Sequence, residues 1–481
     1  MAMTDCSVRD GLKVIGSLAV MLFPLYFWDY WGVPLAQGSH HDDHGDDGHH
    51  DDHGDDHGDD HALADAHGDD AHDYRLPMFY SIVFVVLGGY LAGRFFVVLS
   101  RGCLPAVVGM IVLGIFVKDV CGDSMLAALP TLKELAFMVL LTRAGLHIEP
   151  DALNGLTIAL GTLPVTMDAL GIALTTMLWK KWSFLEAIVL GVLCAGCGDG
   201  LVLPKQREML DKGFGLTPTL AYVAAPLEVC FSFVVAGIVA GVAGLPALPT
   251  WQVVLVFGPC SIVVTCVVSV ALAWFGSKLA EGRKHFTVGG APLLLGTMAE
   301  ELLLLLGAAV ILHQIAGAHP VLVPAFRGLP LMQLDLAIIV HGFTYGQLRG
   351  HQAAHELDEM LGQAWLFAAP FLFVAIGTSI TWSALANTTY FALPILAVGV
   401  ACRALTCCVL FKATPESRRA HGHDAREAEA WHLHALYLTI AELGRATVQG
   451  AILNSAVDNH WFQSFKNVKI QETAIATIMY K

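Results

Sequence analysis

The chain has 481 residues, of which 55% are hydrophobic and only 14% are charged, and its mean hydropathy is +0.61. This balance excludes a water-soluble globule and is typical of a protein that crosses a membrane many times. No basic stripe or nucleic-acid-binding module is visible, so we expect no nucleic acid among its partners. We also predict that the chain is not an enzyme, because it has no phosphate-binding loop and no nucleophile motif in a plausible setting.

The first segment, residues 1–38, contains an apolar run from Val14 to about Trp31 that follows Arg9 and Lys13. It fits either a cleaved signal peptide or a first membrane span. We favour a retained span or signal anchor, because Asp29 and the neighbouring tyrosine and tryptophan residues are typical of an interfacial anchor.

Residues 39–75 form a His/Asp-rich segment that contains fourteen aspartates and no lysine or arginine between His40 and Asp73. The rest of the chain is therefore almost neutral. Such a composition cannot bury a core and predicts disorder. Imidazole and carboxylate groups suit weak binding of Zn²⁺ or Cu²⁺, and a solvated spacer is the alternative. The candidate ligands are His40, His41, His44, His49, His50, His53, His57 and His61.

Residues 76–481 are predicted to form one all-α transmembrane domain. Its apolar runs lie near 79–99, 104–118, 132–146, 154–178, 184–204, 216–242, 251–275, 288–315, 329–346, 363–384, 389–413 and 432–457. With the first span and a short last one that we expect to be truncated, these make about fourteen spans. Basic residues concentrate in alternate loops, which predicts a cytoplasmic N-terminus and a lumenal or extracellular His/Asp segment.

One span is interrupted by the sequence CAGCGDGLVLP, from Cys194 to Pro204. Glycine and proline loosen a helix, and a charge at membrane depth is expensive, so such a break persists where protein or a wet cavity satisfies the backbone. The break is assigned to Gly196, Gly198, Gly200 and Pro204, with Asp199 between the glycines. Broken helices of this kind build ion sites in transporters, and a simple kink without a ligand is the alternative.

A symmetry argument relates other intramembrane charges to this break. Two inverted repeats of seven spans would put Asp168 in the fifth span and Arg403 in the twelfth. Opposite charges at equivalent positions predict a buried ion pair. The broken sixth span then pairs with the thirteenth, where glycines surround Arg445. We therefore expect two crossed broken helices at the repeat interface.

Several blocks resemble the NHA-type branch of the cation/proton antiporter superfamily. They are LTRAGLHIEPDAL from Leu141, the run from Asp168 through GDGLVLP, GFGLTPTL with VAAPLE, GVACRALT, and RATVQGAILNSAVD. The resemblance covers roughly residues 76–481 in the same order. It implies a homodimer of fourteen-span subunits that exchange Na⁺ or Li⁺ for protons, with a dimer domain and a mobile core.

The resemblance also implies roles for single residues. Asp168 falls where the family has a membrane glutamate, Arg403 on its partner arginine, and Arg445 on a lysine that precedes the ATVQ block ending at Gln449. The family's paired aspartates are replaced by the single carboxylate Glu228. Asp199 replaces part of the usual unwound segment, and we expect it to supply a second carboxylate opposite Glu228.

We therefore expect a multi-pass antiporter with Glu228 and Asp199 as proton- and ion-exchanging groups. Its membrane would be the plasma membrane or an acidic or other endomembrane organelle. A carboxylate in partly desolvated surroundings takes up protons near neutral pH, so that proton and cation loading exclude one another. The first alternative is a membrane scaffold or sensor that kept the fold and lost transport. A zinc transporter is a further alternative, because of the His/Asp segment.

Overall fold

The computed structural model describes residues 77–101, 105–148, 150–244, 250–281, 287–288, 291–292, 298–322, 332–380, 382–413 and 431–444. The predicted first span, the His/Asp segment with its candidate metal ligands, Arg445, Gln449 and the predicted last span lie outside these residues. The domain boundaries proposed at residues 38 and 75 therefore stay predictions.

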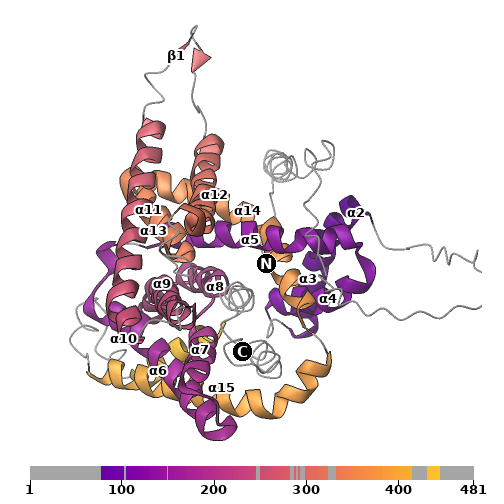
Figure 1. Ribbon diagram of the computed structural model, residues 1–481, viewed down its shortest axis with the longest axis vertical. Helices are drawn as coiled ribbons and strands as arrows, with labels where there is room; N and C mark the ends of the chain where they lie inside the picture. Colours follow the sequence, from indigo (N-terminus) through magenta and orange to yellow (C-terminus); the bar gives the residue numbers. More distant parts are fainter. Residues whose placement is uncertain are drawn as a thin grey trace, which may run out of the picture. The chain divides into compact units, whose positions relative to one another are not determined.

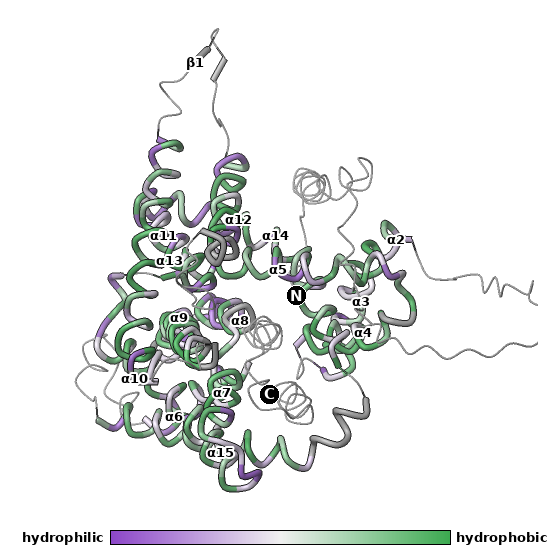
Figure 2. The backbone as a smooth tube through the Cα atoms, in the orientation of Figure 1, coloured by the Kyte–Doolittle hydropathy of each residue, from purple (hydrophilic) through white to green (hydrophobic). Residues whose placement is uncertain are grey.

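The described residues form helices (Figure 1), with one short pair of strands. Eight of these helical segments are long and apolar enough to cross a membrane, and Figure 2 shows the hydrophobic colour along them. They are Met78–Leu99, Asp123–Leu146, Gly155–Lys180, Thr217–Val239, Val253–Glu281, Met298–Ile315, His351–Thr378 and Tyr390–Ala413. The chain is thus a multi-pass membrane protein, as its composition predicts.

The helices pack into two bundles. We call the first the scaffold bundle, in which α5 packs on α13 and α14, α14 on α4, and α11 on α13. Its members are α2 (Met78–Val83), η1 (Phe84–Gly88), α3 (Gly89–Leu99), α4 (Ala106–Val120), α5 (Asp123–Leu146), α10 (Thr250–Gln252), η3 (Val253–Phe257), α11 (Gly258–Glu281), α12 (Met298–Leu322), α13 (Leu334–Arg349) and α14 (His351–Thr378).

We call the second the core bundle, in which α6 packs on α7, α9 and α15, and α18 packs on α15. Its members are α6 (Gly155–Lys180), α7 (Phe184–Ala195), α8 (Asp199–Asp211), α9 (Leu216–Gly244), α15 (Trp382–Ala413) and α18 (Trp431–Ala441). The two bundles pack less extensively on one another: α8 touches α5 and α14, and α9 touches α5, η3, α11 and α13.

Local sequence explains where the core helices begin. Asn154 accepts hydrogen bonds from the backbone N–H groups of Leu156 and Thr157, and Thr157 accepts one in return, so a capping box starts α6. Ser183 and Glu186 form the same motif at the start of α7. These caps satisfy donors that a helix start otherwise leaves without partners.

Three predicted spans have wrong limits. Residues 288–315 were predicted to be one span, yet Thr287–Val288 (β1) pairs with Ala291–Pro292 (β2) in antiparallel register, and α12 begins only at Met298. The span predicted at 363–384 in fact runs from His351 to Thr378. Its start was placed too late because the first turns of the helix are polar. The span predicted at 132–146 begins earlier, at Asp123, and contains Pro130.

Candidate functional site

The helix break lies between α7 and α8, and it is shorter than the sequence predicts. The chain leaves helical geometry at Gly196 and re-enters it after Gly198, so that Asp199 is the first residue of α8. Gly200 and Pro204 lie inside α8 and do not belong to the break. Pro204 is the sixth residue of α8, beyond the first turn, so the helix lacks the hydrogen bond that an N–H there would donate to the Gly200 carbonyl.

Other core elements satisfy the backbone groups that the break leaves free. The N–H of Cys197 donates to Oε1 of Glu228 at 2.8 Å. The N–H of Gly198 donates to the carbonyl of Gly444 at 2.8 Å, so the segment that follows α18 meets the break. The carbonyl of Ala195 accepts from Nη2 of Arg403 at 3.0 Å. The break is therefore held by protein, as a non-helical segment at membrane depth requires.

Arg403 on α15 is completely buried and binds three carboxylates that are also completely buried. Its Nη2 lies 2.6 Å from Oε1 of Glu228, and its Nη1 lies 3.0 Å from Oε2 of the same carboxylate. Its Nη1 also donates to Glu442 at 2.6 Å, and its Nε donates to Asp168 at 3.2 Å. We call Arg403, Asp168, Glu228 and Glu442 the arginine centre.

Close helix packing brings the arginine centre together. A Cβ at Gly399 on α15 would collide with Oδ1 of Asp168 and with the side chain of Ile172 on α6. A Cβ at Gly191 on α7 would collide with the backbone of Ala169. Small residues thus let α6, α7 and α15 approach closely enough for Asp168 to reach Arg403.

Sequence reasoning missed Glu442. The residue follows α18 in the apolar run ending in IAELGR, three residues before Arg445. The rule that an ionisable residue in a predicted span is functional by default would have selected it. With Glu442 included, the described members of the centre carry three carboxylates against one guanidinium. An excess of buried carboxylates is a setting that favours the uptake of protons or cations.

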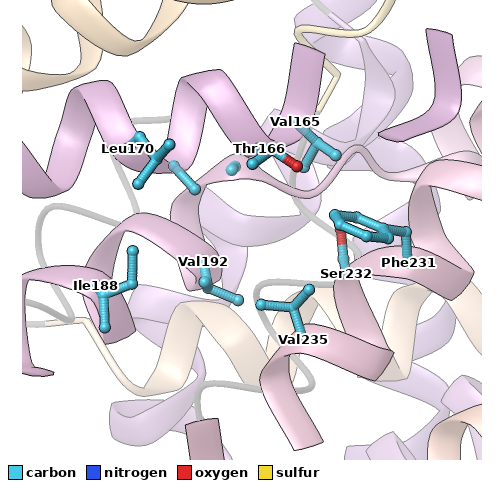
Figure 3. A pocket seen from close by; sticks show the side chains of 10 residues that line it. Val165, Thr166, Leu170, Ile188, Val192, Phe231, Ser232 and Val235 are labelled. Carbon is cyan, nitrogen blue, oxygen red and sulfur yellow. The ribbon is translucent and has the colours of Figure 1, made fainter. Parts of the chain in front are cut away.

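Two cavities are lined in part by the two helices that flank the break, one by α7 and the other by α8. The first, on the α7 side, has a volume of about 90 Å³ and an almost wholly apolar lining, shown in Figure 3. It adjoins the arginine centre because Ala195 and Ser232 line it, and Ser232 lies one helical turn after Glu228. Within the described residues, the buried Ser232 hydroxyl has no hydrogen-bond partner.

The second cavity, on the α8 side, has a volume of about 430 Å³ and a lining of mixed polar and apolar groups. It is bounded by both bundles, since Arg207 and Tyr222 come from the core helices α8 and α9, and His147 and Asp358 come from the scaffold helices α5 and α14. A cavity of this size and polarity can hold several waters. The cavity on the α8 side is thus larger and more polar than the one on the α7 side.

Two further buried acids, Glu301 and Asp358, lie in the scaffold bundle. Glu301 is fully buried, accepts two hydrogen bonds from Arg349 at 2.6 and 3.0 Å, and accepts one from the Tyr345 hydroxyl at 2.9 Å. Arg143 donates to Asp358 at 2.8 Å. Neither pair touches the arginine centre.

The fold is that of a cation/proton antiporter. A solved structure of the sodium proton antiporter MjNhaP1 from Methanocaldococcus jannaschii at pH 8 matches with a TM-score of 0.64 and 14% sequence identity, over 84% of this chain and 93% of that chain. At this identity the match establishes the fold alone.

Two curated relatives carry the sequence similarity. Sodium/hydrogen exchanger 9B1 of Homo sapiens is 26% identical over 136 residues, which is 26% of each chain. Sodium/hydrogen exchanger 9B1 of Mus musculus is 26% identical over 168 residues, covering 31% of this chain and 29% of the relative. The matches thus span between a quarter and a third of the relatives' length. No family model matches the chain.

Together these findings confirm the resemblance to the NHA-type branch of the cation/proton antiporter superfamily. The named relatives are transporters, which agrees with the prediction that the chain is not an enzyme.

Proposed function

We propose that this chain is a secondary transporter that exchanges a monovalent cation, Na⁺ or Li⁺, for protons by alternating access. The observation that carries the proposal is the arginine centre, in which three buried carboxylates share one guanidinium beside a broken helix. The antiporter fold and the named exchangers support the same class.

Glu228 is the exchanging group in this proposal. Its carboxylate is held by Arg403 and by the Cys197 N–H at the break. A proton from water that binds a Glu228 oxygen neutralises the carboxylate and weakens its ion pair with Arg403. A cation bound to the same oxygens competes with Arg403 directly. Proton and cation loading therefore exclude one another, which is what antiport needs.

Asp168 and Glu442 hold the guanidinium while Glu228 is loaded. Both already bind Arg403, at 3.2 and 2.6 Å, so Arg403 keeps anionic partners when it releases Glu228. A buried arginine left without any partner would cost several kcal/mol. Asp199 stays a proposed second cation ligand, because it begins α8 directly after the break.

The wider assembly follows from the resemblance as a set of proposals. We propose a homodimer in a lipid bilayer, with fourteen spans in two inverted seven-span repeats and two crossed broken helices. The N-terminus is cytoplasmic and the His/Asp segment lumenal or extracellular, in the plasma membrane or in an acidic or other endomembrane organelle. The His/Asp segment binds Zn²⁺ or Cu²⁺ weakly.

Proteoliposomes test the exchange. A pH-sensitive dye inside the vesicles should report proton flux when a Na⁺, Li⁺ or K⁺ gradient is imposed between about pH 6 and 9. We expect flux with Na⁺ or Li⁺, and weaker flux with Asp199→Ala. An Asp199→Ala protein with unchanged ion affinity and flux would remove Asp199 from the site.

A membrane scaffold without transport is the second candidate. One observation favours it: Glu228 already accepts hydrogen bonds from Arg403 and from the Cys197 N–H at the break, as a purely structural carboxylate would. The absence of flux with every cation over the whole pH range would select it. Zinc-driven flux that survives deletion of residues 39–73 would instead support zinc transport.

A further inference from the structure

The sparse boundary between the two bundles has a charged contact on the α8 side of the break. Nη1 of Arg207 on α8 lies 3.3 Å from Oδ2 of Asp358 on α14, and its Nη2 lies 3.2 Å from Nε2 of His355. The Arg207 side chain is 41% exposed, whereas Asp358 is 9% exposed. The contact therefore joins a buried scaffold carboxylate to a partly exposed side chain of the core bundle.

Asp358 is anchored within its own bundle. Nε of Arg143 donates to its Oδ1 at 2.8 Å, and Nε2 of His147 lies 3.2 Å from the same oxygen. Arg143 lies in the last turn of α5, and His147 directly follows that helix. Loss of Arg207 would leave these two scaffold contacts in place. A buried carboxylate without a cationic partner is strongly destabilising. Because Asp358 keeps its scaffold partners, Arg207 can bind and release it without that penalty.

Arg207 is rigidly linked to the break. It lies eight residues after Asp199 on the same helix, which corresponds to about 12 Å at 1.5 Å per residue. The contact also lies at the edge of the 430 Å³ cavity that both bundles bound. A movement of the core bundle against the scaffold would carry Arg207 away from Asp358 and change that cavity.

We propose that Arg207 and Asp358 are positioning residues for transport, which hold the core bundle in the state whose cavity opens on the α8 side. The inference rests on the proposed function, because alternating access requires one bundle to move against the other around a fixed site. Release of the contact accompanies conversion to the state that opens on the α7 side.

Arg207→Gln is the main test, measured in the full chain in proteoliposomes of known orientation. An exposed ion pair contributes up to about 1 kcal/mol, so its loss changes the equilibrium constant between the two states by up to about fivefold. We expect the apparent KM for the cation to rise when the cation is added on the α8 side and to fall when it is added on the opposite side. Maximal flux should change less than either KM.

Two further variants act as controls. Arg207→Lys keeps the charge and should restore both KM values towards wild type. Lys205→Gln removes a cation from the same helix whose partner is Glu208 on that helix, 2.8 Å away, so neither KM should move. Unchanged KM values in Arg207→Gln, or an equal rise on both sides, would overturn the proposal.

Hydrogen–deuterium exchange of the purified protein separates this inference from the proposed function. In Arg207→Gln, amides of α8 and of the first turns of α14 should exchange faster, and in Lys205→Gln they should not. This result supports the contact as a link between the bundles even if wild type shows no cation-dependent flux. Unchanged exchange in Arg207→Gln would overturn it whether or not the protein transports.

Discussion

Two fully buried glutamates in this protein meet an arginine in different settings. Glu301 in the scaffold bundle is bound by its own Arg349 and by the Tyr345 hydroxyl, between continuous helices. Glu228 in the core bundle shares Arg403 with two other carboxylates and also binds the broken backbone between α7 and α8.

The comparison shows that burial alone does not define an exchange site. A glutamate with one dedicated arginine and a hydroxyl partner has its charge balanced, and it stabilises the packing of α12 on α13. A glutamate that competes with two others for one guanidinium can be released when a proton or a cation takes its place. Within the described residues, the excess of carboxylates over arginine and the adjoining break distinguish the core glutamate.

The largest expected effect is that of Arg403→Gln. It leaves three carboxylates buried without their shared guanidinium, and removing one partner of a buried ion pair costs about 3–5 kcal/mol. We expect a large loss of folded protein, measured as detergent-solubilised yield and melting temperature. A variant that melts like wild type would show that the centre does not hold the core bundle together.

Glu301→Gln should be destabilising but should keep transport. The loss of charge-assisted hydrogen bonds from Arg349 is expected to cost about 1.5–3 kcal/mol. The melting temperature should fall, while cation-dependent proton flux per folded molecule should match wild type. Lost flux with an unchanged melting temperature would place the ion path in the scaffold bundle and reverse the comparison.

A smaller effect is expected from Gly399→Ala, which inserts a methyl group against Asp168 and Ile172. Overpacking of this kind costs about 1–3 kcal/mol, and it should also disturb the Asp168–Arg403 contact and lower the flux. Gly307→Ala on α12 is the matched control, because a Cβ there meets nothing within 4 Å. It should leave flux and melting temperature close to wild type.

Hydropathy was enough to predict most helix positions, but not the limits that polar residues set. The first turns of α14, from His351 to Asp358, are polar and lie outside any apolar window, and their ion pairs appear only once α5 and α8 pack beside them. The partner of one of these residues was also hidden from the sequence. Arg143 on α5 could have extended its side chain to the membrane surface, but it binds Asp358, which is 215 residues away in the chain.

The candidate site was predictable only in part, because the sequence did not show which distant charges meet. Repeat symmetry suggested a pair between Asp168 and Arg403, which lie in contact. Symmetry has no counterpart for Glu442, and it gave no sign that Arg403 also binds Glu228. The width of the break was overestimated because Gly200 and Pro204 disfavour a helix in isolation, yet α8 begins at Asp199 and continues through both residues.

The most direct test of the central claim is sodium-driven proton flux in proteoliposomes that contain Glu228→Gln. The amide oxygen can still accept from the Cys197 N–H, and Asp168 and Glu442 still bind Arg403, so the protein should fold. Its melting temperature should fall about as much as that of Glu301→Gln, which is measured beside it as the control. We predict no sodium-dependent flux above empty vesicles for Glu228→Gln and wild-type flux for Glu301→Gln. Wild-type flux from folded Glu228→Gln would contradict the assignment of the arginine centre as the exchange site.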